Sequence, residues 1–201
     1  FDVLNANRFR INGSGEVLLS NVNGAAKVES SYKSVNFENI GGALTIESES
    51  GEVIGKNVRG DCAITASYKL IDLAHIGGRL TLNAPSCTIS VLDVRKDVTI
   101  ESNYKPIQVD SVGGSLTIRG ESTSVAAKVI AGGVDITTSY QTVRVEQVGG
   151  DLRLDGNSCD ITVFEVKHNV ALISSYKDIR VSKVGGSLDI AGNSSNVFVR
   201  E

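Results

Sequence analysis

The sequence predicts an all-β fold, a single-stranded parallel β-helix with 18 residues in each turn. Three observations lead to this prediction. Apolar residues recur at an interval of 18 from Val22 to the end of the chain, without insertion or deletion. Within each repeat they alternate with polar residues, which is the pattern of half-buried strands. Gly, Ser, Asn and charged residues separate these segments, as expected at the corners between strands.

The first position of the repeat is Val or Ile in every turn. Its members are Val22, Ile40, Val58, Ile76, Val94, Val112, Ile130, Val148, Val166 and Val184. Positions 5 and 7 form one alternating apolar pair, and positions 14 and 16 form another, so we expect two or three short strands per turn. A single turn cannot bury its apolar face, but stacked turns align equal positions into columns. With about 4.8 Å between turns, about 11 turns make a rod of roughly 50 Å.

Right-handed winding is the expectation. A left-handed β-helix also takes about 18 residues per turn, but it needs apolar residues at positions 1, 7 and 13. Position 13 carries Glu52, Asp160, Asp178 and Asn196. The sequence therefore disfavours the left-handed alternative.

The chain is expected to form one domain over residues 1–201, with a capping turn at 1–21 and ten regular turns at 22–201. Phe9 and Ile11 fall one place out of register, which is typical of a terminal repeat. Nothing follows residues 196–199 to cover them, and an uncovered strand edge is a template for another chain. This predicts a possible homo-oligomer through the C-terminal turn.

Composition excludes several partners. The formal charge is −3, with Lys and Arg scattered, so neither nucleic acid nor a membrane surface is an expected partner. No apolar run is long enough to span a membrane, and no signal peptide is present. Because Phe1 is not an initiator Met, we expect a mature or excised domain, whose missing N-terminus could have held a targeting segment. Three cysteines argue against a disulfide framework.

A V-G-G-x-L-x-I pattern recurs at residues 112–118 and 184–190, and residues 148–154 match it except for a final Leu. In this pattern the chain resembles the bacterial candidate-adhesin domains of unknown function, which are β-strand-repeat proteins. The resemblance implies a parallel β-helix and a role in the cell envelope or at the cell surface. It implies no site residues.

All tyrosines of the chain fall at position 11 of alternate turns, with Ser at that position in the turns between. The candidate surface stripe consists of Tyr32, Lys33, Tyr68, Lys69, Tyr104, Lys105, Tyr140, Tyr176 and Lys177, and Gln141 replaces Lys after Tyr140. Two interpretations remain open. Each Tyr packs over the Ser of the neighbouring turns, or the stripe faces solvent and binds a glycan or an anionic envelope polymer through its rings and cations.

Glycine pairs occupy positions 2 and 3 of the Ser-type turns: Gly41-Gly42, Gly77-Gly78, Gly113-Gly114, Gly149-Gly150 and Gly185-Gly186. No helix follows them, so they do not predict a phosphate loop. We expect them to form tight corners that require positive φ.

No metal, cofactor or catalytic residue is predicted. His75 and His168 lie five turns apart, and Cys87 and Cys159 lie four turns apart, roughly 19 Å. Cys62 takes an inward position and is expected to be a buried thiol. Carboxylates such as Glu101 and Glu121 could approach each other, but no insertion forms a cleft around them.

The sequence therefore predicts a non-enzymatic binding scaffold or adhesin of the bacterial cell envelope or exterior. One alternative is a structural protein that self-assembles end to end, as cytoplasmic bactofilin polymers do. A polysaccharide-active enzyme is the remote alternative.

Overall fold

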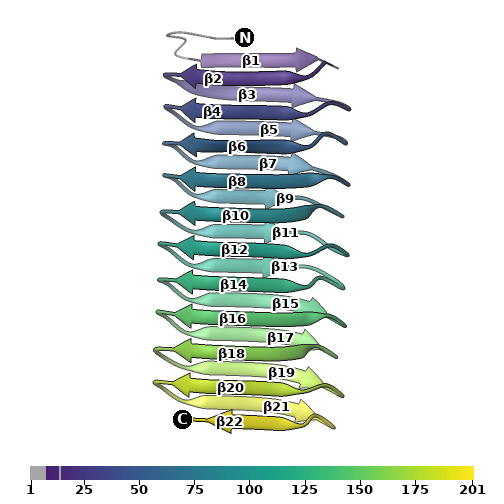
Figure 1. The fold of residues 1–201 in the computed structure, drawn as a ribbon, viewed down its shortest axis with the longest axis vertical. Coiled ribbons are helices and arrows are strands. Elements are labelled where there is room, and N and C mark those ends of the chain that lie inside the picture. The colour runs from purple at the N-terminus through teal and green to yellow at the C-terminus, as the bar shows by residue number, and fades with distance from the viewer. Residues whose placement is uncertain (1–7, 14) are drawn as a thin grey trace.

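A computed structural model describes residues 8–13 and 15–201, and these residues form an all-β solenoid of parallel strands (Figure 1). Each turn contributes one strand to each of two sheets, and the two sheets have eleven strands each. The odd-numbered strands form one sheet and the even-numbered strands the other. The predicted parallel β-helix is thus confirmed, with two strands per turn.

The strands follow the alternating segments of the sequence. The odd sheet contains β1 (Arg8–Gly13), β3 (Ala25–Ser30), β5 (Leu44–Ser48), β7 (Cys62–Ala66), β9 (Leu80–Asn83), β11 (Val98–Glu101), β13 (Leu116–Arg119), β15 (Val134–Ser139), β17 (Leu152–Asn157), β19 (Val170–Ser175) and β21 (Leu188–Asn193). The even sheet contains β2 (Val17–Val22), β4 (Val35–Ile40), β6 (Val53–Val58), β8 (Leu70–Ile76), β10 (Thr88–Val94), β12 (Ile107–Val112), β14 (Val125–Ile130), β16 (Thr142–Val148), β18 (Asp160–Val166), β20 (Ile179–Val184) and β22 (Val197–Arg200).

The strand register matches the repeat of the sequence. Val98 pairs with Leu116 and Ile100 pairs with Ile118, so equal positions of successive turns stand in columns. The first pair of strands in the odd sheet differs, because Phe9 pairs with Ala26, one residue short of the usual repeat. This offset is the one that the sequence predicts for the N-terminal turn.

The core runs between the two sheets along the length of the solenoid. The columns at positions 1, 5, 7, 14 and 16 point inward, as predicted; in the central turn Val98 and Ile100 are fully buried, and so are Ile107 and Val109 to within 2 %. Burial of each such aliphatic side chain stabilises the fold by roughly 1.5–3 kcal/mol. The sheets are therefore held together by side chains that the repeat places in register.

Each even strand from β2 to β20 bends just before position 1. In β10 the bend is at Asp93, which has a φ of 57° and is skipped in the pairing with β12. The residues at this position all adopt positive φ: Asn21, Asn39, Asn57, His75, Asp93, Ser111, Val129, Gln147, Glu165 and Lys183. The bend turns position 1 back toward the core, so each of these strands contributes to three apolar columns.

Candidate ligand-binding surface

The five tyrosines stand in one file along an edge of the solenoid. They follow β3, β7, β11, β15 and β19, and the loops after the odd strands all lie along the right-hand edge of Figure 1. The exposed fractions of Tyr32, Tyr68, Tyr104, Tyr140 and Tyr176 are 69, 70, 62, 65 and 69 %. The rings are therefore largely open to solvent, as the ligand-binding interpretation requires.

The corners between the odd and even sheets have two alternating forms. In four of the Ser-type turns the residue after Ser is small and buried: Gly51, Cys87, Thr123 and Cys159. In the Tyr-type turns the equivalent residue is exposed: Lys33, Lys69, Lys105, Gln141 and Lys177. Alternate corners are therefore drawn inward, and the Tyr corners between them project.

Hydrogen bonds hold the inward corners in place. The Cys87 N–H donates to the Ala84 carbonyl at 3.3 Å, which closes a tight turn. The Ser102 hydroxyl donates to the same carbonyl at 2.6 Å. In a later corner, the Thr138 hydroxyl donates to the Thr123 carbonyl at 2.9 Å. Buried polar groups keep such partners because an unpaired one costs free energy. These inward residues were not predicted from the sequence, although small residues alternate there with Lys or Gln.

The backbone under the tyrosines is in the left-handed region. Tyr68, Tyr104, Tyr140 and Tyr176 have φ values of 68, 64, 62 and 64°. For an L-residue this conformation costs roughly 1–2 kcal/mol, and Gly or Asn adopts it most readily. The Tyr104 N–H donates to the Glu121 carbonyl of the next turn at 3.0 Å, and Tyr68, Tyr140 and Tyr176 make equivalent bonds. The base of each ring is thus fixed to the solenoid.

The cations of the stripe are largely free of acidic partners. Lys177 Nζ lies 3.9 Å from Asp160 Oδ2. Within the described part of the chain, Lys33, Lys69 and Lys105 form no ion pair. The corner between Tyr68 and Tyr104 carries no charge, since it reads Pro-Ser-Cys-Thr at residues 85–88. The stretch from Tyr68 to Lys105 is therefore the most positive part of the stripe.

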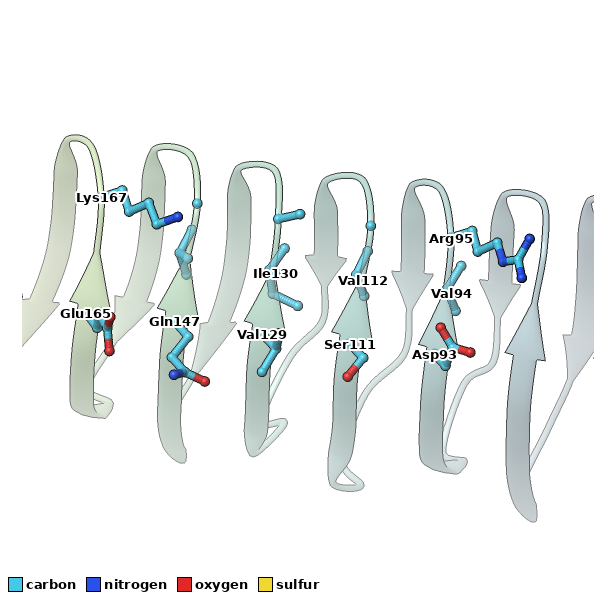
Figure 2. A pocket seen from close by; sticks show the side chains of 14 residues that line it. Asp93, Val94, Arg95, Ser111, Val112, Val129, Ile130, Gln147, Glu165 and Lys167 are labelled. Atoms are coloured by element: carbon cyan, nitrogen blue, oxygen red, sulfur yellow. The ribbon is translucent and has the colours of Figure 1, made fainter.

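A groove follows the opposite edge, where the even strands join the next odd strands. Figure 2 shows its second half, about 840 Å³, with Arg95 and Lys167 at its two ends. A row of residues in the left-handed bends lines one side: Asp93, Ser111, Val129, Gln147 and Glu165. A further 1000 Å³ extends from Asp93 and Arg95 toward Asn21.

The polar side chains in the first half of the groove bond to one another. The Asn39 amide donates to Asn21 Oδ1 at 3.0 Å, and Asn57 donates to Asn39 Oδ1 at 2.9 Å. His75 Nδ1 lies 2.8 Å from Asp93 Oδ2. The side chains of this row thus satisfy one another. The groove was not predicted from the sequence.

The first glycines of four pairs line this groove, namely Gly41, Gly77, Gly113 and Gly149, but they are not there for the predicted reason. No glycine of the described residues has positive φ, so the predicted positive-φ corner is wrong. A Cβ on Gly113 would lie 2.4 Å from the Arg95 carbonyl oxygen, and one on Gly149 would lie 2.2 Å from that of Ala131. Glycine is therefore needed at these positions because the backbones of successive turns approach closely. The left-handed bend lies two residues before the first glycine of each pair.

The remaining chemistry-bearing groups are dispersed. Cys62, Cys87 and Cys159 are free and buried. Burial raises the pKa of Cys62 to about 12 and also raises the pKa of Cys87 and Cys159. Among the described residues no three His, Cys, Asp or Glu side chains gather into a possible metal site. No helix among these residues has the length and apolar character needed to cross a membrane.

Comparisons with known protein families, with curated proteins and with solved structures gave no match.

Proposed function

We propose that this solenoid is a non-catalytic scaffold that binds an extended polymer along its long axis. The tyrosine file, consisting of Tyr32, Tyr68, Tyr104, Tyr140 and Tyr176, is the binding surface. The observation that carries the proposal is the exposure of every ring, at 62–70 %, with four of the five on left-handed backbone that Gly or Asn would occupy at lower cost. Selection for stability of the fold alone would not favour Tyr at these corners.

The internal repeats support a role for the rings themselves. The residue two places after each Tyr varies freely: it is Ser34, Leu70, Pro106, Thr142 and Asp178. The residue directly after the fourth Tyr has changed from Lys to Gln. Tyr is nevertheless present in all five turns. An exposed ring provides a flat apolar face with a polar tip, which suits stacking on sugar rings.

The rings are placed to act on one long ligand. Successive tyrosines lie two turns apart, about 9.6 Å, which exceeds the 4.5–7 Å of a stacked aromatic pair. Each ring is therefore available to a ligand rather than covered by its neighbour. A polymer that lies along the edge contacts several rings at once, and weak contacts then add up to a useful affinity.

The resemblance of the glycine-containing turns to candidate-adhesin domains supports the bacterial cell envelope or exterior as the location of this binding. We include in the proposal that the ligand is a glycan or another envelope polymer.

A polymer-binding assay tests the proposal. The wild-type protein is incubated with a panel of insoluble and immobilised polymers, including peptidoglycan sacculi, chitin, cellulose and dextran. We expect retention on at least one of them, and loss of that retention in Tyr68→Asn/Tyr104→Asn, because Asn keeps the left-handed corners. Leu92→Ser is the matched control, since Leu92 is 46 % exposed on the even sheet, away from the file. Equal retention of both variants would refute the proposal.

End-to-end self-assembly is a second candidate function. It is favoured by the exposure of Val197, Phe198 and Val199 on β22, at 44, 50 and 55 %, in the turn that nothing in the described chain covers. Backbone groups at a strand edge pair readily with another strand. Light scattering over a dilution series tests it: concentration-dependent filaments that Phe198→Lys abolishes support assembly, and a monomer at all concentrations excludes it.

A further inference from the structure

We propose that the ligand of the tyrosine file is an extended β-1,4-linked glycan with one acidic group per disaccharide, bound with one Tyr at each disaccharide. This inference rests on the proposed polymer-binding function and assigns its substrate class. Three properties of the file lead to it: its period, its continuity and its charge.

The period of the file is two turns. Adjacent strands in a sheet lie about 4.8 Å apart, so rings in alternate turns repeat at about 9.6 Å. In an extended β-1,4-linked glycan each sugar is flipped relative to the one before it. The same sugar face therefore returns once per disaccharide, at an interval close to that of the rings. If a Tyr stood in every turn, each successive sugar would have to present the same face to the protein, which a β-1,4-linked chain of this kind does not do.

The corners between the rings leave room for the second sugar. In the turn between Tyr68 and Tyr104, Ser86 is only partly exposed and Cys87 is buried. Partly exposed Ser also separates the next rings, at Ser122 and Ser158. The surface thus alternates between a projecting ring and a recessed small polar residue. A flipped sugar, which presents its opposite face to the surface, lies over the recess.

The file is continuous over its length. Every odd strand pairs in parallel with the next, and from β3 to β21 equal positions of the repeat lie opposite each other. The corners consequently lie in one line along the edge in Figure 1. A stiff, extended chain can follow such a line, whereas a coiled α-linked glycan cannot keep contact with successive rings.

The cations repeat with the rings. Lys69 and Lys105 each follow a Tyr, are exposed, and have no acidic partner within the described residues, and the corner between them is uncharged. A ligand that bears one carboxylate per disaccharide places its charges at the same interval. Exposed ion pairs of this kind contribute modestly, about 0.2–1 kcal/mol each, so the rings carry affinity and the cations select acidic chains.

Defined oligosaccharides test this assignment by calorimetry. The probe is the peptide-free glycan strand of peptidoglycan, a β-1,4-linked chain with one lactyl carboxylate per disaccharide, at lengths of one to five disaccharides. We expect the affinity to rise with each added disaccharide. Tyr104→Asn should lower the affinity of the longest strand by about threefold to tenfold. Lys69→Gln/Lys105→Gln should reduce binding of this strand but leave binding of neutral chitin oligosaccharides unchanged.

The other outcomes overturn the assignment in distinguishable ways. Equal binding of dextran, or an affinity that does not change with chain length, would contradict the match between ring period and disaccharide. Equal binding of acidic and neutral β-1,4-linked chains would contradict the acidic ligand. In both cases polymer binding through the file would still stand. Absence of binding to every polymer by the folded protein would refute the assignment together with the proposed function. Lys128→Gln, which removes a cation from the even sheet, is the control for general charge effects.

Discussion

The Phe37 ring fills the space next to Gly55. The two residues pair directly in β4 and β6, and a Cβ on Gly55 would come within 2.4 Å of the ring. Most other residues of this column are of medium size, such as Val91 and Val109, which pair in β10 and β12. The large side chain of Phe37 therefore fills the space that two side chains of medium size fill elsewhere in the column, and Gly55 leaves room for it.

This pairing predicts strong coupling between two substitutions. Gly55→Val alone should lower the free energy of unfolding by about 1–3 kcal/mol, because it overpacks the core against the ring. Phe37→Val alone should lower it by a similar amount, because it leaves a cavity. The double variant should recover at least about 1 kcal/mol of the summed loss. Urea unfolding of the four proteins measures the coupling, and strictly additive losses would show that the two positions are independent.

Val129 is a strained residue in the groove. It has a φ of 56°, in a column where Asn occurs three times, and it is 42 % exposed. Since β-branched residues are genuine outliers at positive φ, Val129→Asn should raise the free energy of unfolding by about 1–2 kcal/mol. Ser111→Asn, in the adjacent turn, is the control and should change it by less than about 0.5 kcal/mol. A loss of stability in Val129→Asn would mean that the Val side chain contributes packing that outweighs the strain.

The three thiols should be protected while the solenoid is folded. Only the thiolate is nucleophilic, and burial raises the pKa of Cys62 to about 12. A colorimetric thiol reagent at pH 8 should therefore react with the native protein no faster than the protein unfolds. In denaturant all three cysteines should react at once. Rapid native-state labelling of Cys87, followed in a variant with Cys62→Ser and Cys159→Ser, would show that the inward corners open in solution.

The ion pair of Arg119 and Asp135 makes part of the stability depend on pH. The hydrogen bonds from Arg119 lower the pKa of Asp135 below its ordinary value of 3.8, against an opposing effect of burial. A carboxyl whose pKa is lower in the folded state stabilises the fold above pH 3.8, and this contribution is lost as the pH falls through the lower folded value. Both side chains are more than a third exposed, so the effect is expected to be below about 1 kcal/mol.

Chemical unfolding of Asp135→Asn at several pH values measures this contribution. The difference in unfolding free energy from the wild type should be constant near neutrality and shrink below pH 3.8. Asp189→Asn is a suitable control, because Asp189 occupies the same position of the repeat and forms no ion pair in the described chain. A difference from the wild type that does not change with pH would contradict the role of the Asp135 charge.

The fold was predictable because the repeat has no insertion. An unbroken 18-residue period with alternating apolar residues leaves few arrangements that bury Val98, Ile100, Ile107 and Val109 together. The register of every described strand pair after the first follows from it. Even the offset of Phe9 and Ile11 was visible as a displaced pattern.

The corners were less predictable, because side-chain patterns do not determine where the backbone turns left-handed. The Gly113-Gly114 pair suggested positive φ, but the bend lies at Ser111, and the glycines are required by the approach of the neighbouring turn. Similarly, the spacing of the tyrosines could not show their exposure. That exposure depends on the inward corners at residues such as Cys87, which are set by hydrogen bonds rather than by the apolar repeat.

In the most direct test, all five tyrosines are replaced by Asn. The test measures whether this variant is retained on the polymer that the wild-type protein binds. Because the rings are exposed and most stand on left-handed backbone, the variant should melt at the same temperature as the wild type or higher. It should no longer be retained on the polymer. A folded variant that binds as well as the wild type would contradict the central claim, and so would a variant that loses the fold because the rings are removed.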